Sequence, residues 1–585
     1  MRKIVFTFCL GIFSAIGFAQ TAKDTIKTEV INVITSYTPT ISDAFKIKKN
    51  PKIKLGNRAQ KRTLKYQIFS APVASTFIPK TGTAKGINYG PKEQLYKNYL
   101  ALGYGNYNSP FAEIFLNKTS RSKSDVGLYA KYISSENSVD NTPLNSNFSN
   151  LVVGAYFQQN NKDYNWKIGA NYELNNYNWY GLPNTIPFTP TTTNGIEELQ
   201  KYNYVNLEAD LNFKDYFFSG VKGNISSFSD QFSSKELRAL VDPQFKISLK
   251  NIGRKLNDLI IATSFDYLNG EFAQSYSSTS KLEYSFFTTS LAPNYTINSG
   301  DFRAKLGTKL VFSSDLENKT SQVFIYPDVT ISYPIVANFI SLYLGAKGGL
   351  TTNTYKEFSD KNPFVAPTLF ITQTNTKYDF FGGFNGKLSS NITYNLKASY
   401  SDVNDLPLYI RNNSKSDGTT SIVNTIPLKG YEYGNSFSVV YDDVKTVAFF
   451  GELSIELSKN LTVGANSLFR SYTTTSQPVA WNLPTMNAEL FAKFTTNKWY
   501  ANSNIFLVSE RKDATYSGTY PSAINGQQTL KSYLDVNING GYHFNDRFSA
   551  FLKMNNILNS DYQRLANFNV QGFQVLGGIS YKFDF

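Results

Sequence analysis

The stretch that decides the fold is FQVLGGISYKFDF, from Phe573 to Phe585. Its odd-numbered positions carry Phe, Val, Gly, Ile, Tyr, Phe and Phe, whereas its even-numbered positions carry Gln, Leu, Gly, Ser, Lys and Asp. Because successive side chains of a strand point to opposite faces, this pattern predicts one apolar, aromatic face and one mostly polar face. An amphipathic strand of a soluble sandwich alternates in the same way. A C-terminal aromatic residue on the apolar face favours instead the closing strand of a barrel in a lipid bilayer.

The same alternation recurs upstream, in residues 486–494, 499–507, 534–544 and 548–554, with short turns after residues 494 and 544 and a longer loop, Glu510–Gln527, between the two hairpins. Short turns alternate along the chain with longer polar loops, among them Asn175–Leu199, Thr351–Lys377 and Asp402–Glu432. This parity predicts an all-β fold: a single large antiparallel transmembrane β-barrel of about 22 strands over residues 95–585, with short periplasmic turns and long extracellular loops. Two strand-like runs, Pro363–Thr374 and Ser436–Asp442, would break the parity, and we assign them to the long loops.

Composition favours this architecture over a bundle of membrane helices. Aromatic residues make up 15% of the chain, with 46 Phe and 40 Tyr against 4 Trp, yet the mean hydropathy is −0.31. A chain this polar is not expected to form a helical membrane protein. A transmembrane barrel tolerates this polarity because only alternate residues face lipid, and aromatic residues gather at both bilayer interfaces.

Residues 1–19 have the features of a secretory signal peptide. A basic head at Arg2 and Lys3 precedes an apolar run that is too short for a spanning helix, and we expect cleavage after Ala19. The only cysteine, Cys9, lies inside this segment. The mature chain is therefore expected to have neither disulfides nor thiolate chemistry.

The positive charge of the chain is concentrated in one segment. Of the net charge of +14, residues 44–92 contribute +12, because they contain twelve Lys and Arg and no Asp or Glu. Residues 20–94 therefore form a basic, mostly irregular periplasmic leader, too polar to fold as a domain of its own. The leader is a candidate lumen insert, a candidate binding segment for an anionic or protein partner, or a solvated tail.

Near the C-terminus, FSAFLKMNNILNSDYQ at Phe548–Gln563 resembles the penultimate strand of TonB-dependent receptors. In that family an Asn-Leu-Phe/Leu-Asn-like run followed by Tyr precedes the last strand. This chain carries the pattern at Asn556, Ile557, Leu558, Asn559 and Tyr562. The resemblance covers residues 95–585 and implies a receptor-type barrel, consistent with the expected strand number.

The N-terminal part departs from the family. Glu29-Val30-Ile31-Asn32-Val33 resembles the TonB box, which pairs with TonB as an added strand, although a short β-prone stretch gives the same letters. Family members carry a folded plug of over a hundred residues inside the barrel, whereas only about 75 residues separate the expected signal peptide from the first strand here. The missing plug weakens the expectation of active, ligand-gated transport.

Few residues point to other chemistry. The only histidine, His543, is expected on the lumen side near a periplasmic turn, where alone it supports neither a metal site nor a catalytic triad. Asp402 with Asp405, and Asp442 with Asp443, are interpreted as solvated loop carboxylates rather than calcium ligands. Aromatic residues of the loop 175–188 offer a sugar-stacking surface, but interface aromatics are the commoner explanation; they are Tyr177, Trp179, Tyr180 and Phe188.

Together these patterns predict an outer-membrane protein of a Gram-negative bacterium that is not an enzyme, needs no cofactor or metal, and takes up or transports a solute. Two alternatives stay open: a passive porin-like channel, and a structural subunit of an outer-membrane protein complex. Expected partners are outer-membrane lipid, the barrel-assembly machinery through the C-terminal signature Tyr581, Phe583 and Phe585, and TonB or another periplasmic or outer-membrane protein through the leader 44–92. Nucleic acid is not expected as a partner in this compartment.

Overall fold

The computed structural model describes residues 96–584 except 121–122, 137–138, 141, 251 and 254–255. In this part of the chain, 22 strands form one antiparallel sheet. Each strand pairs with its neighbours in chain order, and β1 (Asn98–Gly105) also pairs with β28 (Gln574–Phe583), which closes the sheet into a barrel. The predicted fold and strand number are therefore confirmed.

The barrel strands between β1 and β28 follow one another in chain order, joined alternately by tight turns and by longer loops. The first ten are β2 (Ser109–Thr119), β3 (Ser124–Ser135), β4 (Phe148–Asn160), β5 (Tyr164–Asn178), β6 (Leu199–Phe213), β7 (Phe218–Asp230), β8 (Lys235–Ile247), β9 (Leu259–Phe272), β10 (Leu282–Ser299) and β11 (Phe302–Asp315). The other ten are β12 (Thr320–Val336), β13 (Ile340–Thr352), β14 (Gln373–Ser389), β15 (Ile392–Arg411), β18 (Phe437–Ser458), β19 (Leu461–Thr474), β20 (Met486–Thr495), β21 (Trp499–Val508), β24 (Tyr533–His543) and β25 (Phe548–Asn555).

Side chains alternate between the two faces of the barrel wall, as the sequence pattern predicts. In β6, Val205 and Leu207 are exposed on the outside, whereas Asn206 between them is buried on the inside. In β28, Ile579 and Tyr581 are exposed on the outside in the same way. The outer face is thus apolar and aromatic, and the inner face is polar.

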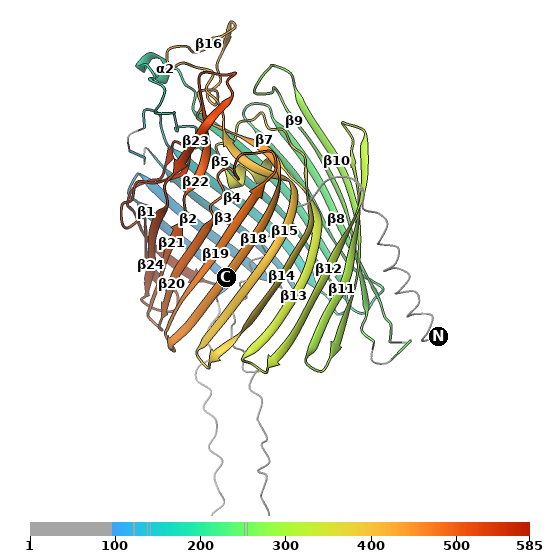
Figure 1. Ribbon diagram of the computed structural model, residues 1–585. Helices are drawn as coiled ribbons and strands as arrows, with labels where there is room; N and C mark the ends of the chain where they lie inside the picture. The colour runs from blue at the N-terminus through green and yellow to red at the C-terminus, as the bar shows by residue number, and fades with distance from the viewer. Residues whose placement is uncertain are drawn as a thin grey trace, which may run out of the picture. The chain divides into compact units, whose positions relative to one another are not determined.

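The two ends of the barrel differ, as Figure 1 shows. The connections 178–199, 353–372, 411–437, 508–533 and 555–574 lie at one end, which we call the loop end, and tight turns lie at the other, the turn end. Small elements lie within these loops: α2 (Pro190–Asn194), α3 (Tyr355–Lys361), and the hairpins β16–β17 (Ile422–Val423 and Ile426–Pro427), β22–β23 (Arg511–Tyr516 and Ile524–Leu530) and β26–β27 (Gln563–Leu565 and Phe568–Asn569).

Two strands extend further toward the loop end than the sequence pattern predicted. β15 has 20 residues and β18 has 22, and their outer parts pair with each other from Leu406↔Asp442 to Arg411↔Phe437. The run Ser436–Asp442 therefore belongs almost entirely to β18, which corrects its assignment to a loop. The run Pro363–Thr374 does lie mostly in a loop, and only Gln373 and Thr374 belong to β14. Apolar and aromatic side chains continue along both extensions, from Leu406 to Ile410 and from Phe437 to Tyr441, so the sequence contains no boundary at the membrane edge.

The residues expected to form the signal peptide, the basic leader and the TonB-box-like stretch Glu29–Val33 lie outside the described part of the chain. Within that part, no helix is both long enough and apolar enough to cross a membrane.

Candidate functional site

The loop between β13 and β14, residues 353–372, folds into the barrel against the wall formed by β5 to β9; we call it the inner loop. Its helix α3 begins because the Thr354 side chain accepts a hydrogen bond from the Glu357 backbone N–H at 3.1 Å, as in a capping box. Lys361 at the last turn complements the helix dipole. The helix is therefore defined locally, and its position is set by contacts with distant strands.

The N-terminus of α3 rests on a carboxylate of the barrel wall. Glu236 of β8 accepts the backbone N–H groups of Tyr355 at 2.6 Å and Lys356 at 3.2 Å. The Tyr284 hydroxyl donates to the same carboxylate at 2.8 Å. A carboxyl group at a helix N-terminus satisfies unpaired amides. Burial raises the pKa of Glu236 to about 7, and the hydrogen bonds from Tyr355, Tyr284 and Lys356 oppose this shift because they stabilise the ionised form. Glu236 therefore anchors the inner loop to the wall.

The register of three neighbouring strands builds this anchor. Gly270 of β9 stands opposite both Glu236 of β8 and Tyr284 of β10. The Tyr284 ring lies over Gly270, where an added Cβ would overlap the ring. Glycine is thus required at this position because the ring of Tyr284 must cross it to reach Glu236.

A second acid holds the same helix from the side. Asp230, the last residue of β7, accepts the Tyr355 hydroxyl at 2.8 Å and the backbone N–H groups of Phe232 and Ser234 at 2.8 and 2.9 Å. Burial raises the pKa of the Tyr355 phenol well above its usual value, and the negative charge of Asp230 adds to the shift. The phenol therefore remains a hydrogen-bond donor at neutral pH.

Aromatic rings surround Tyr355 on the wall side. Its ring packs edge to face against Phe272 at 4.9 Å, Phe228 at 5.0 Å and Tyr202 at 6.0 Å between centroids. These residues come from β6, β7 and β9, and all of them are buried. Such pairs add about 0.5–1.5 kcal/mol each beyond the apolar area that they bury. The inner loop is thus held by a hydrophobic cluster as well as by charged hydrogen bonds.

Ion pairs join α3 to the wall as well. Lys356 lies 3.1 Å from Glu173 of β5 and 4.6 Å above the ring of Tyr204. Glu357 lies 3.8 Å from Arg238, which binds Asp266 through two hydrogen bonds of 2.8 Å. Because α3 follows β13 and contacts β5 to β9, the inner loop folds into the lumen at the loop end and lies against this part of the wall.

The far half of the inner loop joins the other loops. Phe364 stacks on Phe568 of β27 at 3.8 Å between centroids. The Phe437 backbone donates to the Phe364 carbonyl at 3.0 Å and accepts from the Ala366 N–H at 2.8 Å. Loops far apart in the sequence therefore pack against one another across the end of the barrel.

Trp179 and Tyr180, predicted as interface aromatics or a sugar platform, belong to this packing. Trp179 is fully buried and contacts Phe232 and Tyr431 at 5.5 and 5.4 Å between centroids. The Tyr180 hydroxyl donates to the Asn569 carbonyl at 2.8 Å. Both earlier interpretations of Trp179 are wrong, because no face of its ring is accessible.

The motif residues near the C-terminus lie just beyond the penultimate strand. β25 ends at Asn555, and Asn556 adopts a left-handed φ of 46° that stops the strand. The buried Asn556 side chain donates to the carbonyls of Ser560 and Gln571 at 2.9 Å and accepts the Ser560 N–H at 2.9 Å. It thus connects both ends of the loop 556–573.

The other motif residues continue this loop. The Ile557 N–H donates to the Val536 carbonyl at 2.9 Å, and the Tyr562 hydroxyl donates to Asp535 at 2.8 Å. The Asn559 side chain accepts the Phe573 N–H at 2.7 Å, whereas Leu558 is exposed.

The C-terminal signature residues Tyr581 and Phe583 lie in the closing strand, β28. Their rings stack at 5.8 Å between centroids, and the strand pairs with β1 on one side and β25 on the other. Phe585 lies outside the described residues.

Neither the histidine nor the aspartate pairs form a metal site: the described residues contain no cluster of three or more His, Cys, Asp or Glu that could hold a metal. His543 ends β24 at the turn end and is hydrogen-bonded to Ser549 at 2.7 Å. Asp442 is buried rather than solvated, because its carboxylate accepts the backbone N–H groups of Thr475, Ser476 and Gln477 at 2.7–3.1 Å. Asp402 is also buried, 3.3 Å from Lys377, which corrects the solvated interpretation.

Sequence reasoning missed the residues that matter most at the loop end: Glu236, Asp230 and Tyr355. The capping box at Thr354 and Glu357 was the one local signal, and it predicts a helix inside the loop 351–377. Glu236 has no comparable signal because its partners are distant in the sequence: Tyr284 is 48 residues away and Tyr355 is 119 residues away.

The inner wall of the barrel is lined by charges in close pairs. Lys167 lies 2.6 Å from Glu208, and Lys305 lies 2.7 Å from Asp328. A wall of this kind is compatible with a hydrated lumen and unlike an apolar core.

We compared this architecture with those of known proteins. No family model matches the chain, and no curated protein matches it. Solved structures do match: the pyoverdine outer membrane receptor FpvA from Pseudomonas aeruginosa PAO1, bound to pyoverdine, has a TM-score of 0.61 and 12% identity, over 85% of this chain and 79% of that one. The FrpB iron transporter from Neisseria meningitidis has a TM-score of 0.61 and 9% identity, over 84% and 82%. This chain has the barrel fold of the TonB-dependent receptors.

A third receptor-type barrel agrees with this conclusion. The ferric-catecholate import receptor Fiu from K12 E. coli, in a closed form, has a TM-score of 0.59 and 9% identity, over 84% of this chain and 81% of that one. The resemblance predicted from Asn556–Tyr562 and the closing strand is therefore confirmed for the barrel fold.

Proposed function

We propose that this protein is an outer-membrane barrel that takes up a solute, with the inner loop as the gate at its loop end. One observation carries the proposal: α3 lies inside the lumen of a barrel with a charged, polar wall, and its N-terminal residue Tyr355 is bound by Glu236 and Asp230. A loop that folds into the lumen and is bound to the wall at defined residues can be released as a unit.

The similar structures also support a role in solute uptake. The similar structures include a pyoverdine receptor, an iron transporter and a ferric-catecholate import receptor. We place the protein in the outer membrane of a Gram-negative bacterium, exported by residues 1–19 and assembled through Tyr581, Phe583 and Phe585. TonB would engage Glu29–Val33, and residues 20–94 would fill part of the lumen in place of a plug. None of these roles requires an enzymatic step or a cofactor.

The role of the inner loop as a gate is tested by cross-linking it covalently to the barrel wall. Lys356 of α3 and Glu173 of β5 form an ion pair at 3.1 Å, so cysteines at these positions suit a short bismaleimide cross-linker. The only native cysteine, Cys9, lies in the expected signal peptide. We expect the cross-linked K356C/E173C protein to lose planar-bilayer current and solute uptake, while either single variant keeps both.

The role of the leader is tested by comparing the mature protein with a variant lacking residues 20–92. A larger current after the deletion supports a lumen insert, and binding of the TonB C-terminal domain that is lost on deleting residues 29–33 supports driven uptake. No current from either form, together with no TonB binding, contradicts transport.

The packed loop end also favours a second function, that of a structural subunit in an outer-membrane complex. Trp179, Tyr355 and Phe437 are fully buried where the loops pack against one another and against the wall. This alternative predicts stoichiometric partners after purification in mild detergent that are lost when residues 44–92 are deleted. A lone monomer under those conditions contradicts it.

A further inference from the structure

The strand β12, which lies in the wall between β11 and β13 (Figure 1), is paired on only one side over its loop-end half. Its pairing with β11 runs from Thr320 to Ser332, whereas its pairing with β13 runs only from Asp328 to Val336. Among the described residues, the stretch 320–327 therefore has one free edge, which we call the open edge. Along a free strand edge, the N–H and C=O groups of alternate residues point to no neighbouring strand.

The pairing of β12 with β13 stops at a proline. Pro327 comes directly after the last pair, Asp328↔Lys347, and a proline has no N–H to donate to a neighbouring strand. On its other side β13 shifts its register against β14 between Lys347 and Gly349, and it stays paired with β14 up to Thr352, directly before the inner loop. The end of β13 therefore follows β14 and the inner loop and separates from β12.

The outer side chains of the open edge agree with this separation. Val323 is 71% exposed and Ile325 is 64% exposed, whereas their partners on the same face of β11, Phe312 and Leu310, are 40% and 37% exposed. β11 has a paired strand on each side, at β10 and at β12. The higher exposure of Val323 and Ile325 thus reflects the missing neighbour of β12.

The inner face of the open edge, by contrast, is covered. Tyr326 is buried, and its hydroxyl donates to the Asn375 side chain of β14 at 2.5 Å. Phe324 and Leu350 pack in the same apolar cluster. Side chains therefore close the wall on the lumen side, and a partner reaches the open edge from outside the barrel.

The outer face of β12 places the open edge at the border of the bilayer. Every second residue is apolar or aromatic over the twelve positions from Val323 to Ile335. Such a length of a strand tilted by about 45° rises about 28 Å, close to the apolar band of about 25 Å of a transmembrane barrel. Val323 and Ile325 thus lie at the loop-end border of this band. An open sheet edge is unfavourable there because lipid chains cannot bond the free N–H and C=O groups.

We propose that the open edge binds an extended segment of a partner protein by strand addition, with apolar side chains of that segment beside Val323 and Ile325. The free backbone groups select an extended peptide, because another strand satisfies a row of alternating N–H and C=O groups. A second copy of the chain does not fit. Strands tilt by about 35–45°, so a two-fold axis along the membrane normal would cross two copies of β12 at about 70–90°. The inference concerns binding alone and stands whether or not the barrel transports a solute.

The probe is a fluorescein-labelled peptide with the sequence KLVFSSD, that of residues 309–315, because this stretch of β11 already pairs with β12 from Thr320 to Tyr326. Fluorescence anisotropy with the full mature chain in nanodiscs should give saturable binding in the millimolar range or tighter. Two control peptides carry N-methyl groups on one or the other set of alternate residues. Only one set faces the partner in a strand pair, so one control should bind at least about tenfold more weakly and the other like the unmodified peptide.

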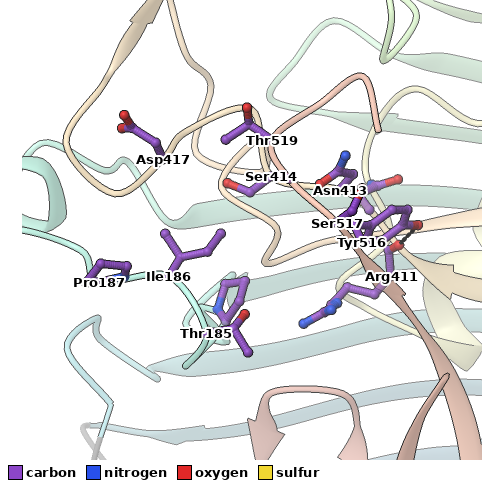
Figure 2. A pocket seen from close by; sticks show the side chains of 13 residues that line it. Thr185, Ile186, Pro187, Arg411, Asn413, Ser414, Asp417, Tyr516, Ser517 and Thr519 are labelled. Carbon is purple, nitrogen blue, oxygen red and sulfur yellow. Dashed lines mark hydrogen bonds between the residues drawn. The ribbon is translucent and has the colours of Figure 1, made fainter. Parts of the chain in front are cut away.

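A substitution tests the site on the protein. A lysine on an exposed edge opposes strand addition, so V323K should bind the peptide at least about tenfold more weakly than the wild type. The control T519K adds the same charge at the same end of the barrel and should bind like the wild type. Thr519 is exposed and lines a cavity of about 260 Å³ between the loops, away from β12 (Figure 2).

The N-methylated peptides keep the test valid where V323K disturbs the barrel. Equal binding of all three peptides, no saturable binding up to millimolar concentration, or equal binding by folded V323K and the wild type overturns the proposal. Binding that is seen only after residues 20–92 are deleted also overturns it, because the leader of the chain itself then covers the open edge.

Discussion

The carboxylate of Glu236, on the inner wall of the barrel, accepts the backbone N–H of Tyr355, the first residue of α3, at 2.6 Å. A single acidic side chain of the wall thus holds the N-terminus of the helix of the inner loop. The bond joins residues 119 positions apart, so the inner loop and the strand β8 depend on each other for their conformations.

Replacing Glu236 by alanine should release the inner loop. The substitution leaves the helix N–H groups and the Tyr284 hydroxyl without their acceptor, at a cost of about 2–4 kcal/mol in the stability of the inner loop. Limited trypsin digestion of the purified protein is the measurement, because α3 contains Lys356 and Lys361. Cleavage after these lysines should be much faster in E236A than in the wild type.

E236Q and E271Q complete this test. E236Q keeps one acceptor oxygen but loses the charge, so its cleavage rate should lie between those of the wild type and E236A. Glu271 lies at the same end of the barrel and pairs with Lys281 at 2.7 Å rather than with the inner loop. E271Q should therefore be digested like the wild type. Equal protection of Lys356 in E236A and the wild type would show that the carboxylate does not hold the loop.

A substitution at Gly270 should release the inner loop as a substitution at Glu236 does, although Gly270 has no side chain that could contact the helix. In G270V the new side chain occupies the place of the Tyr284 ring, which must move and withdraw its hydroxyl from Glu236. We expect the same increase in tryptic cleavage, with a destabilisation of about 1–3 kcal/mol.

The matched control for this variant is Gly349, in β13, where an added Cβ meets nothing within 4 Å. G349A should leave the digestion pattern unchanged. If G270V and G349A behave alike, the close approach of Tyr284 to the wall has no consequence for the inner loop.

The hydrogen bond from Tyr355 to Asp230 should persist well into the alkaline range. In the folded protein the pKa of the phenol is raised above its ordinary value of 10.0. The hydrogen bond therefore stabilises the inner loop fully below pH 10, and this stabilisation is lost as the pH rises through the pKa of the folded state. Y355F lacks the bond at every pH and should open more often in planar bilayers near pH 7, by about 1–2 kcal/mol in the opening equilibrium. The difference between the two proteins should be constant up to about pH 10 and shrink above it. A difference that disappears already near pH 8 contradicts this assignment.

The barrel could be predicted from the sequence because its signal is periodic and local. Each strand contains its own alternation, as Phe573–Phe585 does, and hairpin parity fixes the order of strands without knowledge of distant contacts. The outer part of β18 was missed because it pairs with β15 above the membrane, where alternation no longer separates lipid from lumen. Its sequence is strand-like, but as a separate strand it would have broken the parity of the hairpins; it is instead the beginning of the same strand that continues through the barrel wall.

The loop end could not be predicted in the same way because its contacts are non-local. Nothing near Trp179 in the sequence indicates that Phe232 and Tyr431 will cover its ring. Asp442 illustrates the same limit: its carboxylate binds amides of a loop more than thirty residues later, which turns an apparently solvated acid into a buried one. Only the helix α3 has a local signal in the sequence, the capping pattern at Thr354 and Glu357.

Asn556 should prove essential to the loop that precedes the closing strand. N556A removes the bonds to Ser560 and Gln571 and places a residue with a Cβ and no local hydrogen bond at a φ of 46°, so two unfavourable effects combine. N556G loses the bonds but adopts this φ without strain, and should recover about 1 kcal/mol of the loss. Urea unfolding, followed by heat-modifiable electrophoretic mobility, should give the order of stability: wild type most stable, then N556G, then N556A.

The exposed Leu558 provides the control, and L558A should match the wild type because Leu558 buries little surface. Should N556G be as stable as the wild type, the side-chain bonds contribute nothing, and the left-handed backbone alone explains the asparagine.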